Sequence, residues 1–350
     1  MRVRRYGRSL LFANLLEVVR EQAITVVVGR GLGATATGLW GAGLRLAQLP
    51  VIGITHVAGS VVFPALSRLQ GDVDRLHARF LESLRLISML VIPVCVTLGA
   101  LGTPLVAVLF GERWRLAGEV LSVLSAWALL LSLVEAAKEI FKARGRTAIV
   151  ARAVMVECLA MVAVLVVLWL ADAITLLSVA AAPVIGVAAS AVVAVRALKP
   201  VAGISPADLW GNLGTSIIGG AVQGLVMFLV VYVALPDLTS WTDIGGLDLG
   251  PIIPALILAA IAAAGAGVFA LACEAVDRGS IVSLIATMRS LAAARGDDAG
   301  RDDDVSAGAP DGSGAPPPPH AAPDAWDDTE DLWPPEEEPG RRPASGGDKA

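Results

Sequence analysis

Long apolar runs are the feature that most constrains this chain. Eight stretches are long enough, at about 20 residues each, to cross the hydrocarbon core of a bilayer as an α-helix. They fall at residues 10–29, 37–63, 84–109, 117–137, 148–170, 173–195, 213–235 and 251–273. Apolar residues make up 55% of the chain and the mean hydropathy is +0.71, which excludes an ordinary soluble domain. The sequence therefore predicts an all-α, polytopic bundle of about eight transmembrane helices.

The basic residues predict the orientation of this bundle. If the N-terminus is cytoplasmic, 18 Lys and Arg residues fall in the regions expected inside, and three fall in the loops expected outside. Short cytoplasmic loops carry an excess of Lys and Arg in membrane proteins. The charge pattern therefore predicts that both termini are cytoplasmic.

A change in composition near residue 295 predicts a boundary. Residues 296–350 hold 15 Asp and Glu against four Lys and Arg, and Pro316–Pro319 is an unbroken proline run. Such a segment cannot bury enough apolar surface to fold. We expect a membrane domain over residues 1–295 and a disordered, acidic, Pro/Gly-rich cytoplasmic tail over residues 296–350.

The first two apolar segments contain ionisable and polar side chains that are costly at membrane depth. Helical spacing places several of those in the first segment on one face, with Arg20 beside them: Asn14, Glu17, Glu21 and Thr25. A second set shares a face of the next segment, with His56 at its edge: Arg45, Gln48 and Thr55. Each segment therefore has a polar stripe.

The glycine-rich stretch 29–33 predicts a tight turn that brings these two stripes together. Matching depths along antiparallel helices brings Arg45 within reach of Glu21, with Gln48 close by. Two explanations remain open at this point. The stripes are either a structural ion-pair network that orients two helices, or the lining of a water-filled cavity for a charged or polar substrate.

Motifs for catalysis or cofactor binding are not found. The sequence has no P-loop, HExxH or CxxC motif, and its three cysteines lie in apolar runs without metal-ligand spacing. Glu135, Lys138 and Glu139, at the end of the fourth apolar segment, are expected to be interfacial charges. We therefore expect no enzymatic activity, no cofactor, no metal site and no nucleic-acid partner.

An ordered series of short motifs resembles one family of membrane transporters. The motifs lie at 38–50 (GLWGAGLRLAQLP), 62–70 (VFPALSRLQ), 109–114 (LFGERW) and 142–146 (KARGR). They are similar to the polysaccharide flippases of the MATE-like superfamily, and the similarity extends over roughly residues 6–200. These transporters turn lipid-linked oligosaccharides across bacterial inner membranes.

The resemblance implies that this chain corresponds to part of such a transporter. The family usually has two six-helix lobes, and some members add two helices. The chain resembles the second lobe plus the additional pair, so its first segment would begin the C-terminal lobe. The resemblance therefore implies a fragment, a separate partner lobe or a second copy of the chain as the missing half.

The resemblance also implies roles for the polar stripes. Arg20 and Arg45 would attract the lipid-linked pyrophosphate, assisted by Gln48 and Asn14. Glu17, Glu21 and His56 would balance charge or couple transport to an ion gradient by alternating access. The implied partners are a lipid-linked glycan, membrane lipids and glycan polymerases or transferases. Two alternatives are a cation-coupled drug or solute exporter, and a non-transporting scaffold that recruits partners through its acidic tail.

Overall fold

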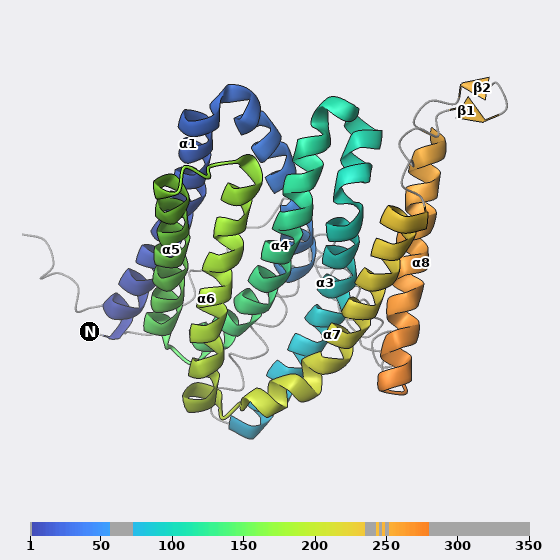
Figure 1. The fold of residues 1–350 in the computed structure, drawn as a ribbon. Helices are drawn as coiled ribbons and strands as arrows, with labels where there is room; N and C mark the ends of the chain where they lie inside the picture. Colours follow the sequence, from blue (N-terminus) through green and yellow to red (C-terminus); the bar gives the residue numbers. More distant parts are fainter. Residues whose placement is uncertain (1, 57–72, 235–242, 245–246, 249–251, 280–350) are drawn as a thin grey trace, which may run out of the picture. The chain divides into compact units, whose positions relative to one another are not determined.

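The computed structural model describes residues 2–56, 73–234, 243–244, 247–248 and 252–279 (Figure 1). Contacts divide the chain into two units, Met1–Leu291 and Ala292–Ala350. The described residues all belong to the first unit. The expected tail over residues 296–350 lies outside them.

Helices form almost all of the described chain. In chain order they are α1 (Arg2–Pro50), α3 (Val73–Phe110), α4 (Arg115–Ala143), α5 (Thr147–Leu170), α6 (Leu176–Ala202), α7 (Pro206–Phe228) and α8 (Ile252–Val276). Short helical turns join or extend them: η1 (Val51–His56), η2 (Glu112–Trp114) and η3 (Leu229–Ala234). Two strands of two residues each, β1 (Asp243–Ile244) and β2 (Leu247–Asp248), pair antiparallel between α7 and α8. The predicted all-α bundle is confirmed apart from this small hairpin.

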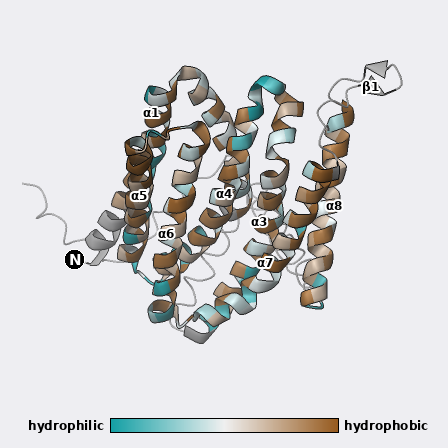
Figure 2. Ribbon diagram, in the orientation of Figure 1, coloured by the Kyte–Doolittle hydropathy of each residue, from teal (hydrophilic) through white to brown (hydrophobic). Residues whose placement is uncertain are grey.

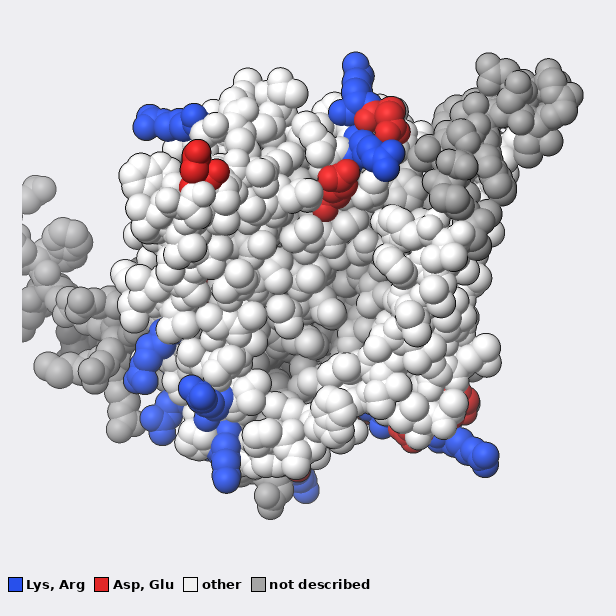
Figure 3. Space-filling model, viewed as in Figure 1, with Lys and Arg blue, Asp and Glu red and all other residues white. Residues whose placement is uncertain are grey.

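Six helices in the described part of the chain are long and apolar enough to cross a membrane, namely α3 to α8. They correspond to the third to eighth expected segments. Apolar residues cover most of their length (Figure 2). On the face drawn in Figure 3, the charged side chains gather at the two ends of the helices and leave an uncharged band between them. This is the surface of a polytopic membrane protein, while the location of the termini remains a prediction.

Helix α1 contains the first expected segment and most of the second. Its helical course is interrupted at Gly33, with φ 89° and ψ 179°, within the predicted glycine-rich turn. These dihedral angles are almost restricted to glycine, because a Cβ atom would clash with the backbone. The chain rises along one limb of α1 and returns along the other (Figure 1). The predicted hairpin is therefore confirmed, although its limbs are not among the six apolar helices.

Two helix boundaries differ from the expected ones. The second limb passes at Val51 into a π-helical turn, and residues 57–63 of the expected segment lie outside the described residues. Helix α3 begins at Val73, eleven residues before the expected start at residue 84. The polar residues that precede the apolar run do not include a signal that ends a helix. They therefore continue into the expected segment 84–109 as one helix.

Helix α4 lies at the centre of the packing that forms the site. It contacts α1, α3 and α6, while α5 packs on both α1 and α6. Large buried side chains, including Trp40, Phe80 and Phe141, fill the space between these helices. Helices α7 and α8 pack on α3 and on each other. The region between α1, α4 and α5 is therefore enclosed by protein.

Candidate functional site

Arg20 forms a buried ion pair with Glu157 in the interior of the bundle. Arg20 lies on the first limb of α1, and its Nη1 donates a hydrogen bond to Glu157 Oε1 on α5. The side chain of Arg20 is 6% exposed and that of Glu157 is 1% exposed. A second contact joins Arg20 Nη2 to Glu21 Oε1 at 3.9 Å. Arg20 therefore has two carboxylate neighbours from two helices.

Lys138 forms a second set of ion pairs. Its Nζ lies 2.9 Å from Glu17 Oε1 on α1 and 2.6 Å from Glu135 Oε1 on its own helix, α4. The Lys138 side chain is 2% exposed. Buried charges in proteins are paired in this way because an isolated ion loses its hydration without compensation. Glu17 and Arg20 are neighbours on one face of α1, so the two sets of ion pairs adjoin, and together they are called the network.

The spacing of the charged residues along their helices explains how the network forms. Glu17 and Arg20 are three residues apart, which places them on adjoining turns of one helix. Glu135 and Lys138 have the same spacing on α4. Glu157 is the eleventh residue of α5, about 15 Å from the start of that helix. The network thus extends from the middle of α5 toward the end of α4.

Close packing of α6 against α5 fixes the position of Glu157. A Cβ atom at Gly186 of α6 would lie 2.9 Å from the Glu157 carbonyl oxygen and 3.5 Å from its Cγ atom. Only a residue without a side chain permits this approach. Gly186 therefore allows α6 to cover the helix that presents the buried carboxylate.

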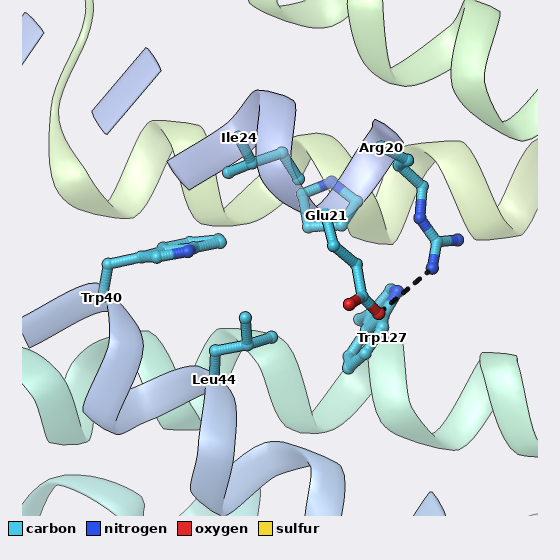
Figure 4. A pocket seen from close by; sticks show the side chains of 7 residues that line it. Arg20, Glu21, Ile24, Trp40, Leu44 and Trp127 are labelled. Atoms are coloured by element: carbon cyan, nitrogen blue, oxygen red, sulfur yellow. Dashed lines mark ion pairs between the residues drawn. The ribbon is translucent and has the colours of Figure 1, made fainter. Parts of the chain in front are cut away.

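A small cavity lies next to the network. Its lining comes from three helices, α1, α4 and α6: Arg20, Glu21, Ile24, Trp40, Leu44, Trp127 and Pro183 (Figure 4). The space open to the centre of a water-sized sphere is about 20 Å³, which suffices for about one water molecule. In Figure 4 the Arg20 guanidinium points toward the Glu21 carboxylate. The surface of the cavity is almost entirely apolar, and the charged groups of Arg20 and Glu21 lie at its edge.

Three buried polar atoms at the site have no protein partner among the described residues. They are the indole nitrogens of Trp40 and Trp127 and Glu157 Oε2. The indole nitrogens can only donate a hydrogen bond, whereas the carboxylate oxygen can accept one. The two indole groups can therefore donate to an acceptor of the size of a water molecule, and Glu157 Oε2 can accept a proton or another cation.

The structure brings together only part of the predicted site. Arg20, Glu17 and Glu21 lie in or beside the network, as the first polar stripe indicates. Arg45 is exposed, and no ion pair joins it to Glu21 within the described residues; Glu21 instead neighbours Arg20. That Arg45 can reach Glu21 therefore remains a prediction.

The other predicted residues have no described contact with the network. Asn14 is exposed and Gln48 is half-buried. The side chain of His56 lies outside the part of the chain that the structure describes. Their roles remain predictions.

Two functional candidates, Glu157 and Lys138, are more central than the sequence suggests. A lone carboxylate in the apolar run of α5 is itself a signal, because ionisable residues inside membrane helices usually have a function. Its partner could not be predicted, since the pairing depends on α5 packing against α1. Lys138 was expected at the interface but is buried instead, because α1 and the glutamates around it cover its ammonium group.

Fold and site together define a multi-pass helical membrane protein with a buried ion-pair network. The solved structure of the lipid II flippase MurJ, in an inward closed conformation, has a similar fold. The TM-score is 0.53, the identity is 16%, and the alignment covers 75% of this chain and 52% of that chain. The chain thus spans about half of that flippase.

Sequence comparisons confirm the resemblance to polysaccharide and lipid-linked oligosaccharide flippases. Residues 1–119 match the profile of the family "Polysaccharide biosynthesis protein". The lipopolysaccharide biosynthesis protein WzxC of Escherichia coli is 25% identical over 142 residues, which are 41% of this chain and 29% of that protein. The teichuronic acid biosynthesis protein TuaB of Bacillus subtilis is 23% identical over 141 residues, 40% of this chain and 29% of that protein.

A third relative is named as a transport protein. The succinoglycan biosynthesis transport protein ExoT of Rhizobium meliloti is 27% identical over 121 residues, or 35% of this chain and 24% of that protein. Each of these three matches therefore covers less than a third of the relative. The chain is a multi-pass membrane protein, and a bacterial inner membrane fits these similarities.

Proposed function

We propose that this chain supplies one lobe of a transporter that moves lipid-linked oligosaccharide precursors across the bacterial inner membrane. The observation that carries the proposal is the buried network of Arg20, Glu157, Lys138 and Glu17 in a MurJ-like fold. The names of the relatives support a glycan precursor as the substrate. The function is transport and not an enzymatic reaction.

The pair of Arg20 and Glu157 is the proposed switch of this transporter. A pyrophosphate group in the lobe competes with Glu157 for the Arg20 guanidinium, which forms strong, charge-assisted hydrogen bonds with phosphate. Once Arg20 turns to the substrate, Glu157 loses its positive neighbour. It then binds a proton or another cation, because an unpaired carboxylate is costly inside the bundle.

This exchange couples substrate to cation in an alternating-access cycle. The charges extend from the middle of α5 toward the end of α4, through Lys138 and its neighbours Glu17 and Glu135. A cation leaving Glu157 can therefore follow a path of carboxylates. The remaining predicted residues are proposed to contact the head group from the first limb of α1 (Asn14), its second limb (Arg45 and Gln48) and η1 (His56).

The same network favours a second candidate function. Four carboxylates in and beside it (Glu17, Glu21, Glu135 and Glu157) outnumber its two basic groups, Arg20 and Lys138. An excess of acid suits cation binding, as in a cation-coupled exporter of drugs or solutes. The relatives' names favour the glycan precursor, so the excess acid is assigned to the coupling cation.

A flipping assay tests the proposed function. The full chain is reconstituted in liposomes with a fluorescent polyprenyl-pyrophosphate oligosaccharide, and transfer is followed by quenching of the label from outside. We expect Arg20→Ala to slow transfer by about tenfold or more, since one charged hydrogen bond is worth about 1.5–3 kcal/mol. The exposed Arg79→Ala variant is the control. Equal rates for Arg20→Ala, Arg45→Ala and the wild type would show that the site is wrongly assigned.

A further inference from the structure

Arg45 and Glu21 present opposite charges on exposed parts of α1. Arg45 is exposed on the second limb, and the Glu21 side chain is 47% exposed on the first. Neighbouring exposed side chains on these limbs are apolar, such as Val18 and Leu49. Glu21 has Arg20 as a partner at 3.9 Å, and Arg45 has no ion pair among the described residues. A charge without a close partner among apolar side chains in a membrane is costly, so it requires a partner or a water-filled cavity.

The two charges lie at the same depth. Each is twelve residues from the break at Gly33, which corresponds to about 18 Å along its limb. They are also near one another in the plane of the membrane, because Glu21 and Leu44, the neighbour of Arg45, line the same cavity (Figure 4). Yet no ion pair joins Arg45 to a described residue of its own chain. Both charges are thus available at a common level.

We infer that a second copy of this chain covers this face, with Arg45 of each protomer paired to Glu21 of the other. All copies insert with the same orientation, because the basic loops set the topology. A two-fold axis along the membrane normal therefore keeps every residue at its depth. A contact with two-fold symmetry contains each residue pair twice, so the dimer would have two ion pairs between Arg45 and Glu21.

The surface around Arg45 permits close contact between copies. Gly38 and Gly41 are seven and four residues before Arg45 and share its face of the helix. A Cβ atom at either glycine would meet nothing within 4 Å in the described structure. Small residues at helix surfaces in membranes allow backbones to approach closely. The face therefore combines room for a neighbouring helix with charges that complement their own copy.

The dimer rests on the proposed function, because the two copies would together enclose a transport path. It also completes the site, since the partner's Arg45 would lie beside Glu21 at the edge of the cavity. Association is nevertheless measured without transport. A monomer that flips substrate would overturn the dimer alone, whereas a dimer that does not flip would overturn the proposed function alone.

Counting subunits tests the inference. The full chain carries one fluorophore and is reconstituted in liposomes at low protein density, where photobleaching steps count the copies in each complex. We expect two steps for the wild type. We expect one step for Arg45→Glu, because this change places a carboxylate against Glu21 in each of the two contacts, and like charges repel. The double variant Glu21→Arg/Arg45→Glu is expected to recover two steps, because both pairs form again with reversed sign. Arg30→Glu, on the same helix near the turn, is the control and is expected to keep two steps.

Cross-linking provides a measurement that does not depend on these charges. Two differently tagged copies, one with Glu21→Cys and one with Arg45→Cys, are expressed together with the three native cysteines replaced by alanine. We expect an oxidised product that carries both tags, and none from two Arg30→Cys copies. Single photobleaching steps for the wild type, two steps for Arg45→Glu, or no cross-linked product would each overturn the dimer.

Discussion

Glu157 holds Arg20 in place from the middle of an apolar helix. Truncation of Glu157 to alanine leaves the Arg20 guanidinium buried without its main counter-charge. Losing one partner of a buried ion pair lowers the free energy of unfolding by about 3–5 kcal/mol. We expect Glu157→Ala to lower the free energy of unfolding by this amount in detergent. Glu82→Ala removes half of an exposed pair and is expected to cost under about 1 kcal/mol. Equal losses of unfolding free energy in both variants would show that the buried pair stabilises the protein no more than the exposed pair does.

Single residues also show what could be predicted from the sequence. The spacing of Glu17, Arg20 and Glu21 places charges on the first limb, and the structure finds them at the network. Arg45 was expected within reach of Glu21, and the structure shows no ion pair between them within the described residues. Depth along a helix follows from residue count, whereas the direction of a side chain depends on how the whole limb is rotated by packing. The sequence cannot supply that rotation.

At the scale of elements, the approach of α6 to α5 determines the geometry of the network. An alanine side chain at position 186 would meet the Glu157 carbonyl oxygen at 2.9 Å. We expect Gly186→Ala to separate the two helices, to destabilise the protein by about 1–3 kcal/mol and to slow flipping. Thermal unfolding in detergent and the liposome assay measure the two effects.

Gly267→Ala on α8 is the matched control. A Cβ atom there meets nothing within 4 Å, so its replacement is expected to be neutral or to stabilise by up to about 1 kcal/mol. If Gly186→Ala were as stable and active as this control, close packing of α6 would not position Glu157. The apolar helices α3 to α8 and the turn at Gly33 were predictable because they depend on local signals, whereas the start of α3 was not. The contact between α5 and α6 was not, because many glycines lie in apolar runs and only a few face another helix.

At the scale of the whole molecule, the acidic segment 296–350 distinguishes a transporter from a scaffold. Its composition predicts no packed core, and the described helices form the network without it. We expect a chain ending at residue 295 to flip substrate at a rate within about twofold of the full chain, since the lobe's charges are unchanged. The same liposome assay measures this rate. Complete loss of transfer in a folded, truncated protein would favour the scaffold.

The central claim is that the buried network handles charge during transport and does not only orient helices. Replacing both members of a buried pair by apolar residues is often neutral for stability, whereas replacing one is not. The double variant Arg20→Leu/Glu157→Leu therefore separates the two roles. We predict that it unfolds within about 1 kcal/mol of the wild type but does not flip lipid-linked oligosaccharide in liposomes. A double variant that is equally stable and flips at the wild-type rate would contradict the account, because the pair would then be structural alone.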